Sequence, residues 1–286
     1  MSSESKTCKN CSKLFTIEPE DFGFYKRIDV PPPTWCPECR AARRMLWRNF
    51  RVLYRDTCDL CGKGMISMYA PASPYKVYCK ECWYSDKWDA LDYGRDYDSS
   101  RPFFDQFGEL LRALLRVSLV QYRVNTNSDY SNYILENKNT YLSFSVVTAE
   151  DIAYCQNLDK CRQTLDSYAG KDLEQCYECI DSSKLYHSDH LYRSRDCISS
   201  SFLFDCVNCQ NCFLSVNLRN KQYVFRNEQL DRWGYEAEMA KIKRGSYTEQ
   251  EELRKEFWER VSGALHKYAD ITRSVNVTGD HIDNAK

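Results

Sequence analysis

The stretch that decides the fold runs from Asp151 to Ser200: DIAYCQNLDKCRQTLDSYAGKDLEQCYECIDSSKLYHSDHLYRSRDCISS. It lies in a longer segment, residues 125–226, that has no proline and one glycine, Gly170. Steps of 21 residues align side chains of one kind. One column is apolar or small and contains Ile134, Cys155, Cys176, Cys197 and Leu218, and a second contains Phe144, Leu165, Tyr186 and Val207. Adjacent columns are polar, for example Ser145, Asp166, His187 and Asn208.

A constant period with polar residues between apolar columns is typical of short strands stacked as a coil. We therefore expect a right-handed parallel β-solenoid of four to five rungs. In that arrangement Cys155, Cys176 and Cys197 lie in adjacent rungs, roughly 4.8 Å apart. The alternative is an antiparallel meander whose cysteines only fill a core. Either way, the fold class is mainly β.

The first eight cysteines come in pairs. Cys8-x-x-Cys11 and Cys36-x-x-Cys39 are separated by 24 residues, and Cys58-x-x-Cys61 and Cys79-x-x-Cys82 by 17. Two such pairs complete a closed tetrahedral site for one metal ion. A single pair would suit a redox role equally well, but two consecutive double pairs favour metal. The sequence therefore predicts two structural Zn²⁺ ions, with these ligands: Cys8, Cys11, Cys36, Cys39, Cys58, Cys61, Cys79 and Cys82.

Composition limits the class of protein. The chain has 286 residues, 43% of them hydrophobic, which is enough for an ordinary core. Its net charge of −1 gives no global argument for a polyanionic partner. We expect no membrane partner, because no stretch approaches the roughly 20 apolar residues that a membrane span needs. The N-terminus lacks a signal-peptide pattern, so the paired cysteines indicate a cytoplasmic protein with reduced thiols.

The motifs resemble one protein family. TCKNCSKLF from Thr7 and WCPECRAARR from Trp35 are similar to the "probable zinc-ribbon" family. The stretches SDKWDALDYGRDYD, RPFFDQFGELL and NCFLSVNLRNKQY resemble its longer members. The family has no established activity, so the resemblance implies only metal ligands at Cys8, Cys11, Cys36 and Cys39.

The remaining segments follow from local patterns. Residues 1–56 are expected to form the first zinc ribbon, 57–98 the second, 99–124 a helical linker, 125–226 the solenoid, and 227–286 helices with the start of a further rung. A helix is predicted from Pro102 to Val117, capped by Ser100. A second is predicted after a capping box at Thr248 and Glu251. Its apolar face packs on or caps the solenoid and contains Leu253, Phe257, Val261 and Leu265. The last twelve residues are mostly small or polar, like those of the solenoid, so we expect the natural chain to continue beyond Lys286.

Six arginines and no acidic residue lie between residues 40 and 55. On one continuous helix, five of them share a face: Arg40, Arg44, Arg48, Arg51 and Arg55. With aromatic neighbours, this basic stripe suits RNA or single-stranded DNA. Two alternatives remain open: the arginines pair with the acidic segment from Asp86 to Asp98, or the helix breaks at Arg51 and continues as a strand.

Other reactive side chains favour structural roles. An iron–sulfur motif would need a fourth cysteine shortly after Cys206, Cys209 and Cys212, and none is present. We therefore interpret these three cysteines, like Cys176 and Cys179, as small residues that fill the core. His187 and His190 are expected to be a solvated surface pair beside Asp189. No catalytic residue is assigned. The predicted function is a zinc-binding adaptor that docks on nucleic acid or a ribonucleoprotein; the alternatives are a solenoid enzyme acting on a carbohydrate or other polymer, and a protein-binding scaffold.

Overall fold

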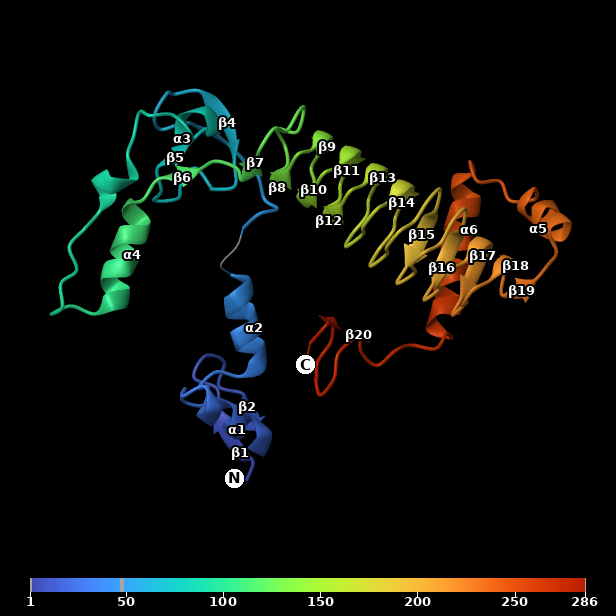
Figure 1. The fold of residues 1–286 in the computed structure, drawn as a ribbon, viewed down its shortest axis with the longest axis horizontal. Coiled ribbons are helices and arrows are strands. Elements are labelled where there is room, and N and C mark those ends of the chain that lie inside the picture. Colours follow the sequence, from blue (N-terminus) through green and yellow to red (C-terminus); the bar gives the residue numbers. More distant parts are fainter. Residues whose placement is uncertain (1, 47–48, 286) are drawn as a thin grey trace. The chain divides into compact units, whose positions relative to one another are not determined.

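The computed structural model describes residues 2–46 and 49–285 (Figure 1). The chain forms two compact units, Met1–Val52 and Leu53–Lys286. In the described residues, strands predominate and six α-helices occur among them. No described helix is both long and apolar enough to span a membrane.

The first unit is a β-hairpin followed by two helices. Strands β1 (Glu4–Thr7) and β2 (Leu14–Ile17) are antiparallel, and Cys8 and Cys11 lie in the turn that joins them. Helices α1 (Pro19–Arg27) and α2 (Pro37–Met45) both begin at a proline, which suits the first helical turn. Neither helix has a buried residue.

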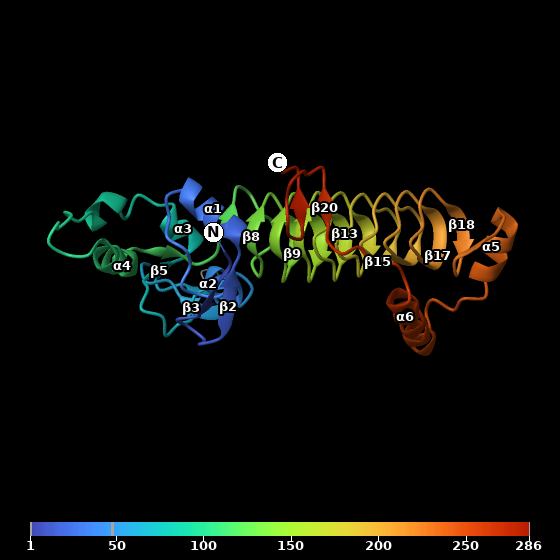
Figure 2. The same cartoon turned by 90° about the horizontal axis from the view of Figure 1, so that it is seen from below.

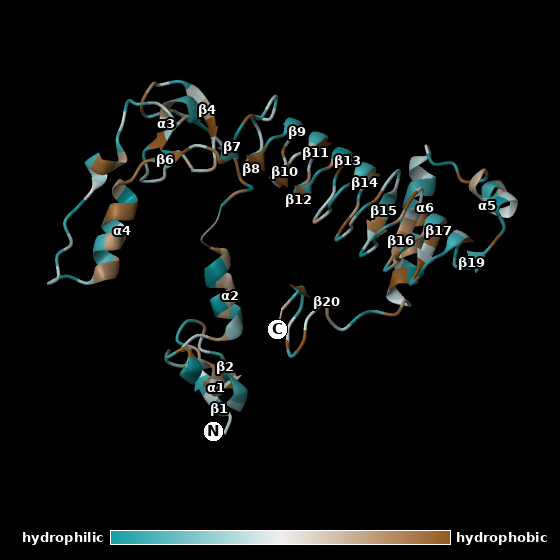
Figure 3. Ribbon diagram, in the orientation of Figure 1, coloured by the Kyte–Doolittle hydropathy of each residue, from teal (hydrophilic) through white to brown (hydrophobic). Residues whose placement is uncertain are grey.

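The second unit opens with the same kind of hairpin. Strands β3 (Tyr54–Thr57) and β4 (Gly64–Ser67) are antiparallel, and β5 (Val77–Tyr78) and the short helix α3 (Lys80–Trp83) follow. A 3₁₀ turn (Ala90–Tyr93) leads to α4 (Phe103–Ala113). The predicted helix at 102–117 is therefore present but ends earlier, and its N-cap is Pro102 rather than Ser100. The aromatic residues near the N-terminus of α4 are exposed, and Figure 3 shows hydrophobic and hydrophilic stretches alternating along this helix.

The segment from β3 to α4, called the opening module below, is joined to the first coil of the solenoid. Strand β6 (Arg116–Val117) pairs in parallel with β5, and the Met68 N–H donates to the Ser118 carbonyl at 2.9 Å. One turn further on, the Asn132 amide donates to the Met68 sulfur. The module thus occupies the N-terminal end of the solenoid, where strand edges would otherwise be open.

The solenoid is a stack of short parallel strands. One side is the sheet β12-β10-β8-β7 and the other is the nine-stranded sheet β19-β18-β17-β16-β15-β14-β13-β11-β9, of which only β19 is antiparallel in the described chain. The strands are β7 (Gln121–Tyr122), β8 (Asn132–Leu135), β9 (Lys138–Tyr141), β10 (Phe144–Val147), β11 (Glu150–Ala153), β12 (Gln156–Asp159), β13 (Arg162–Leu165), β14 (Glu174–Tyr177), β15 (Asp189–Tyr192), β16 (Ser201–Phe204), β17 (Gln210–Val216), β18 (Gln222–Phe225) and β19 (Glu228–Gln229). The parallel solenoid is thus supported, and the antiparallel meander is not.

The period is 12 residues, not 21. Phe144 pairs with Asn132 and Gln156, Arg162 with Glu150 and Glu174, and this offset persists along the stack. Cys155, Cys176 and Cys197 therefore do not stack on one another: Cys176 lies beside Thr164, and Cys155 lies above Ser143. The shorter coil also gives more turns than the expected four to five, because eight successive parallel strands, β9 to β18, line one side of the described solenoid.

Each coil consists of four sides of three residues. Every third residue from Tyr133 to Arg226 has a left-handed backbone with φ near +50°. Asn and Asp tolerate this conformation best, which accounts for their abundance here. The chain turns at each left-handed residue, and the side chain of the next residue points inward. Ile152, Cys155 and Leu158 are examples. The inward positions form the continuous core of the solenoid.

At the inward positions, serine side chains form hydrogen bonds with buried backbone groups. The Ser143 hydroxyl donates to the Tyr141 carbonyl at 2.9 Å and accepts from the Cys155 N–H at 3.1 Å. Ser200 repeats this arrangement with Ile198 and Cys212. A small side chain that both donates and accepts satisfies backbone groups that would otherwise be buried without a partner. The core therefore accommodates small polar residues at inward positions.

Gly170 occupies an inward position where no side chain fits. A methyl group built there would lie 2.3 Å from Leu173 Cδ1 and 3.3 Å from Leu158 Cδ2. Both leucines are fully buried, so they have little room to move. We expect Gly170→Ala to lower the free energy of unfolding by about 1–3 kcal/mol. Urea unfolding followed by circular dichroism measures the change, and an unaltered midpoint would contradict the packing.

Two helices cover the C-terminal part of the solenoid. Helix α5 (Arg232–Met239) contacts β18, and α6 (Tyr247–Ser262) contacts β16 and β17. Figure 2 shows α6 on one flank of the stack. The N-cap is Ser246, not the predicted Thr248, because its hydroxyl accepts from the Glu249 N–H. Leu253, Phe257 and Val261 are buried as expected, and Leu265 is exposed because the helix ends first. A final parallel pair, β20 (Ile271–Thr272) and β21 (Ile282–Asp283), follows, with a register offset of 11 residues rather than the 12 of the solenoid.

Candidate metal centres

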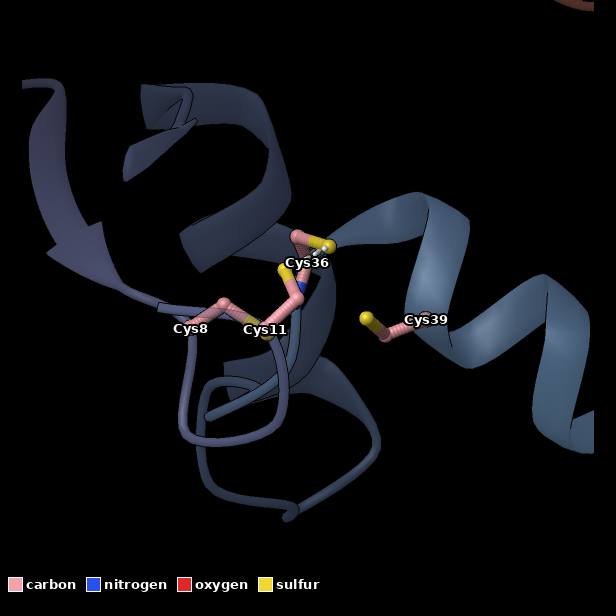
Figure 4. A group of neighbouring side chains, drawn as sticks. All are labelled: Cys8, Cys11, Cys36 and Cys39. Carbon is pink, nitrogen blue, oxygen red and sulfur yellow. Dashed lines mark hydrogen bonds between the residues drawn. The ribbon is translucent and has the colours of Figure 1, made fainter. Parts of the chain in front are cut away.

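The first four-cysteine group is built from a hairpin turn and a helix start. Cys8 and Cys11 come from the turn after β1, and Cys36 and Cys39 from the N-cap and first turn of α2. All four sulfur atoms lie within 4.8 Å of one another (Figure 4). The Cys36 N–H donates to the Cys8 sulfur at 3.2 Å, which fixes the helix start against the turn.

The second group repeats this geometry in the other unit. Cys58 and Cys61 lie in the turn between β3 and β4, and Cys79 and Cys82 lie at the N-cap and first turn of α3. The four sulfurs again lie within 4.8 Å of one another, and the Cys79 N–H donates to the Cys58 sulfur at 3.2 Å. The two sites are thus two copies of one local design.

The sulfur separations fit a tetrahedral zinc site. Zn–S bonds of about 2.3 Å place the four sulfurs of a tetrahedron roughly 3.8 Å apart. The Cys11 and Cys36 sulfurs are 3.7 Å apart, and those of Cys61 and Cys79 are 3.9 Å apart. Each ion would be surrounded by four thiolates, which leaves no position for a substrate or an activated water. The chemistry of such a site is therefore structural.

Backbone N–H donors lower the pKa of one cysteine in each group. Burial opposes ionisation, but N–H groups of Cys36, Cys11 and Asn10 lower the pKa of Cys8 to about 6. The N–H groups of Cys79, Cys61 and Leu60 likewise lower the pKa of Cys58 to about 6. The Cys39 N–H favours ionisation of Cys36, but burial, the Glu38 side chain and the neighbouring sulfurs of Cys39 and Cys11 raise the pKa of Cys36 to about 12. Four crowded sulfurs without a cation thus favour only partial ionisation, and a divalent ion would stabilise all four thiolates.

The remaining cysteines do not form a third group of this kind. Among the described residues, only the two N-terminal groups bring three or more sulfur, nitrogen or carboxylate ligands this close together. Cys206, Cys209 and Cys212 are at most 2% exposed and face inward in the solenoid. Burial also raises the pKa of Cys155 to about 12 and that of Cys161 to about 11. These observations agree with thiols used as core fillers.

The arginine stripe is not one helix. Arg40 and Arg44 lie on α2, which ends at Met45, and Arg55 lies on strand β3 in the other unit. Arg48 lies outside the described residues. The helix does not continue into β3 because the Asn49 side chain binds the Val52 backbone, a turn that competes with helix formation. The strand alternative at Arg55 was therefore right, and the five-arginine helical face was wrong.

Helix α2 nonetheless presents cations to solvent. Arg43 and Arg44 are exposed, and Arg51 is exposed beyond its end. Arg40 is half-buried and donates to the Tyr25 hydroxyl at 3.4 Å. The apolar residues at the end of α2 are uncovered as well, since Met45 and Leu46 are 75% and 84% exposed.

The histidine pair was misjudged from the sequence. His187 is exposed, but His190 is only 5% exposed and is covered by α6. Its Nδ1 lies 2.8 Å from Asp189, and its Nε2 lies 3.3 Å from Glu178 and 3.4 Å from Arg254 Nε. The ring stacks on Phe202. The signal in the sequence was the apolar run after it, Ser201–Phe204, which marks a face that a helix covers.

Comparisons with known proteins add no assignment. No family model, curated protein or solved structure matches the chain. The resemblance to the zinc-ribbon family is supported only by the two four-cysteine groups, which are positioned to bind metal.

Proposed function

We propose that this protein is a non-catalytic zinc-binding adaptor with two zinc ribbons, each organised around one Zn²⁺ ion. The observation that carries the proposal is the repeated four-sulfur geometry, in which a hairpin turn and a helix start supply all four ligands. A closed site of this kind contributes folding energy rather than chemistry. The eight cysteines in these two groups are the proposed ligands.

We also assign nucleic-acid docking to the first unit. Residues 1–52 contain ten Lys and Arg against six Asp and Glu, whereas the whole chain is balanced. Four thiolates with one Zn²⁺ would add two negative charges, and the unit would remain positive. The exposed guanidinium groups of Arg43, Arg44 and Arg51 suit phosphates, and the adjoining Phe50 and Trp35 rings lie within cation–π distance of Arg51 and Arg43. RNA or single-stranded DNA offers both phosphates and unstacked bases.

We propose that the solenoid offers one of its faces to a binding partner. Its outward positions form polar ladders from one coil to the next: Asn127 donates to Asn139 at 3.0 Å, and Asn139 to Asp151 at 2.7 Å. These bonds fix side-chain positions over several coils and produce a regular, rigid face. Such a face suits recognition of a partner in the cytoplasm.

The docking proposal predicts a salt-dependent loss of binding. Replacing Arg43, Arg44 and Arg51 by Ala is expected to weaken binding of single-stranded RNA and to reduce the slope of log K against log salt by about two, because each single-strand phosphate contact contributes roughly 0.7. Filter binding at several salt concentrations measures this slope. Arg40 is left in place because it is half-buried.

The matched control removes the same charge from the solenoid. Arg162, Lys184 and Lys221 are exposed there, and their replacement by Ala should leave RNA binding unchanged. Equal losses for the two triple variants would show a nonspecific charge effect. Absence of any affinity in the parent at low salt would end the nucleic-acid proposal and favour the protein scaffold.

A further inference from the structure

A cavity of about 780 Å³ lies between the solenoid flank and the start of α6. The solenoid contributes residues of β14 to β17, and the other wall comes from the segment that leads into α6. Phe202 and Leu253 form part of its apolar base, and both are buried. The size lies within the range of ordinary small-molecule sites, and a concave site with an apolar base and convergent polar groups is the usual form of such a site.

The charged groups of the wall are already paired. Arg254 lies 2.6 Å from Glu178 and 3.3 Å from Glu251, and Arg244 lies 3.5 Å from Asp189. His190 lies between Glu178 and Asp189. A charged ligand would have to compete with these internal pairs, at a cost in desolvation and lost contacts. The wall therefore disfavours a strongly anionic or cationic ligand.

The groups left for a ligand are two neutral acceptors, a phenol and the exposed imidazole of His187, whose ring stacks on Tyr186. The Gln175 amide donates to Gln163, and the Gln250 amide donates to the Arg244 carbonyl, so each uses its nitrogen. Among the described residues, neither side-chain carbonyl oxygen has a hydrogen-bond partner. Tyr247 is 79% exposed at the rim, with its ring available for stacking. A ligand that fits must be neutral and donate several hydrogen bonds.

We propose that this cavity binds a neutral saccharide of one or two rings. Sugar hydroxyl groups donate to amide oxygens without disturbing the charge pairs, and the apolar face of a pyranose ring packs on an aromatic side chain. The paired network around His190 holds the wall rigid: the Ser201 hydroxyl donates to Asp189 at 2.9 Å, and Arg244 donates to Ser201 at 3.1 Å. A preorganised wall reduces the entropy cost of binding.

An array of neutral and acidic glycans, probed with the intact zinc-loaded protein, tests the proposal. We expect binding to neutral glycans, and isothermal titration with the best mono- or disaccharide should then give a dissociation constant. Replacing Gln175 and Gln250 by Leu is expected to weaken this binding at least tenfold, because each lost hydrogen bond contributes a factor of roughly three to ten. Thermal melting of the variant verifies that the fold is retained.

The solenoid itself supplies a matched control. Gln222 donates to Gln210 at 3.3 Å in the same kind of ladder, outside the lining of this cavity. Replacing this pair by Leu should change the affinity less than twofold. Failure to bind any neutral glycan, a preference for acidic glycans, or equal loss in both variants would each overturn the proposal. None of these results bears on zinc content or RNA binding.

Discussion

Replacing Cys79 by Ser is expected to remove one metal ion and to destabilise the second unit by several kcal/mol. Structural zinc contributes on the order of 10 kcal/mol to the folding of small zinc domains. The second site adjoins β5, which pairs with β6 at the entry to the solenoid. Loss of the site therefore exposes the first coil as well as the ribbon. Metal analysis and urea unfolding, read by circular dichroism, measure the two effects together.

Two other Cys→Ser changes separate metal loss from loss of a thiol. Cys36→Ser should remove one ion and unfold only the first unit, so the unfolding of the solenoid should keep its midpoint. Cys155→Ser should retain both ions and cost about 1 kcal/mol or less, because Ser143 and Ser167 occupy the equivalent corners of the adjacent coils. If Cys79→Ser were no worse than Cys155→Ser, the second site would not be structural.

Phe257→Ala is expected to lower the free energy of unfolding by about 3–5 kcal/mol. Phe257 is 1% exposed on α6 and meets Phe202 and Tyr192 edge to face or tilted, with ring centroids 5.8 Å and 5.6 Å away. Its removal leaves a void that the rigid coils cannot close. The helix should also become more open to hydrogen exchange. Calorimetry and amide exchange in α6 measure these changes.

The neighbouring residue provides the comparison. Trp258 lies on the same helix but is 49% exposed. Trp258→Ala should cost roughly 1 kcal/mol or less, since a side chain that is half in water loses less buried area. Equal effects for the two substitutions would indicate that α6 does not pack on the solenoid as described.

The two four-cysteine groups were predictable because their chemistry is local. Two residues between cysteines place both sulfurs on one turn, and a second pair completes the ligand set whatever the surrounding fold. The amphipathic pattern of Leu253, Phe257 and Val261 was also informative, since a buried helix face repeats every three to four residues. The cap at Ser246 was missed because Thr248 offers a similar signal two residues later.

The solenoid was predicted in kind but not in period. Its inward positions recur every three residues, so any multiple of three aligns buried side chains, and 21 is such a multiple. Only the backbone register distinguishes the true 12-residue coil, in which Cys176 lies beside Thr164. The decisive signal was the residue immediately before each inward-facing one, often Asn or Asp, which adopts the left-handed conformation.

The predictions of one arginine helix and of a solvated histidine pair were wrong for different reasons. Helical periodicity between residues 40 and 55 was overridden by a local turn at Asn49 and by the pairing of β3 with β4. His190 was assigned to solvent from its polar neighbours, but a helix that begins nearly 60 residues later covers it. A contact over that separation leaves no trace in a local pattern.

Elemental analysis of protein purified under reducing conditions tests whether each four-cysteine group binds one zinc ion. We expect two zinc ions per chain in the parent, one in Cys36→Ser and one in Cys79→Ser. Because each site has its own four ligands, the two losses should be independent, and the double variant should contain none. A parent with a single zinc ion, or with iron and visible absorbance, would contradict the assignment of two closed four-cysteine zinc sites.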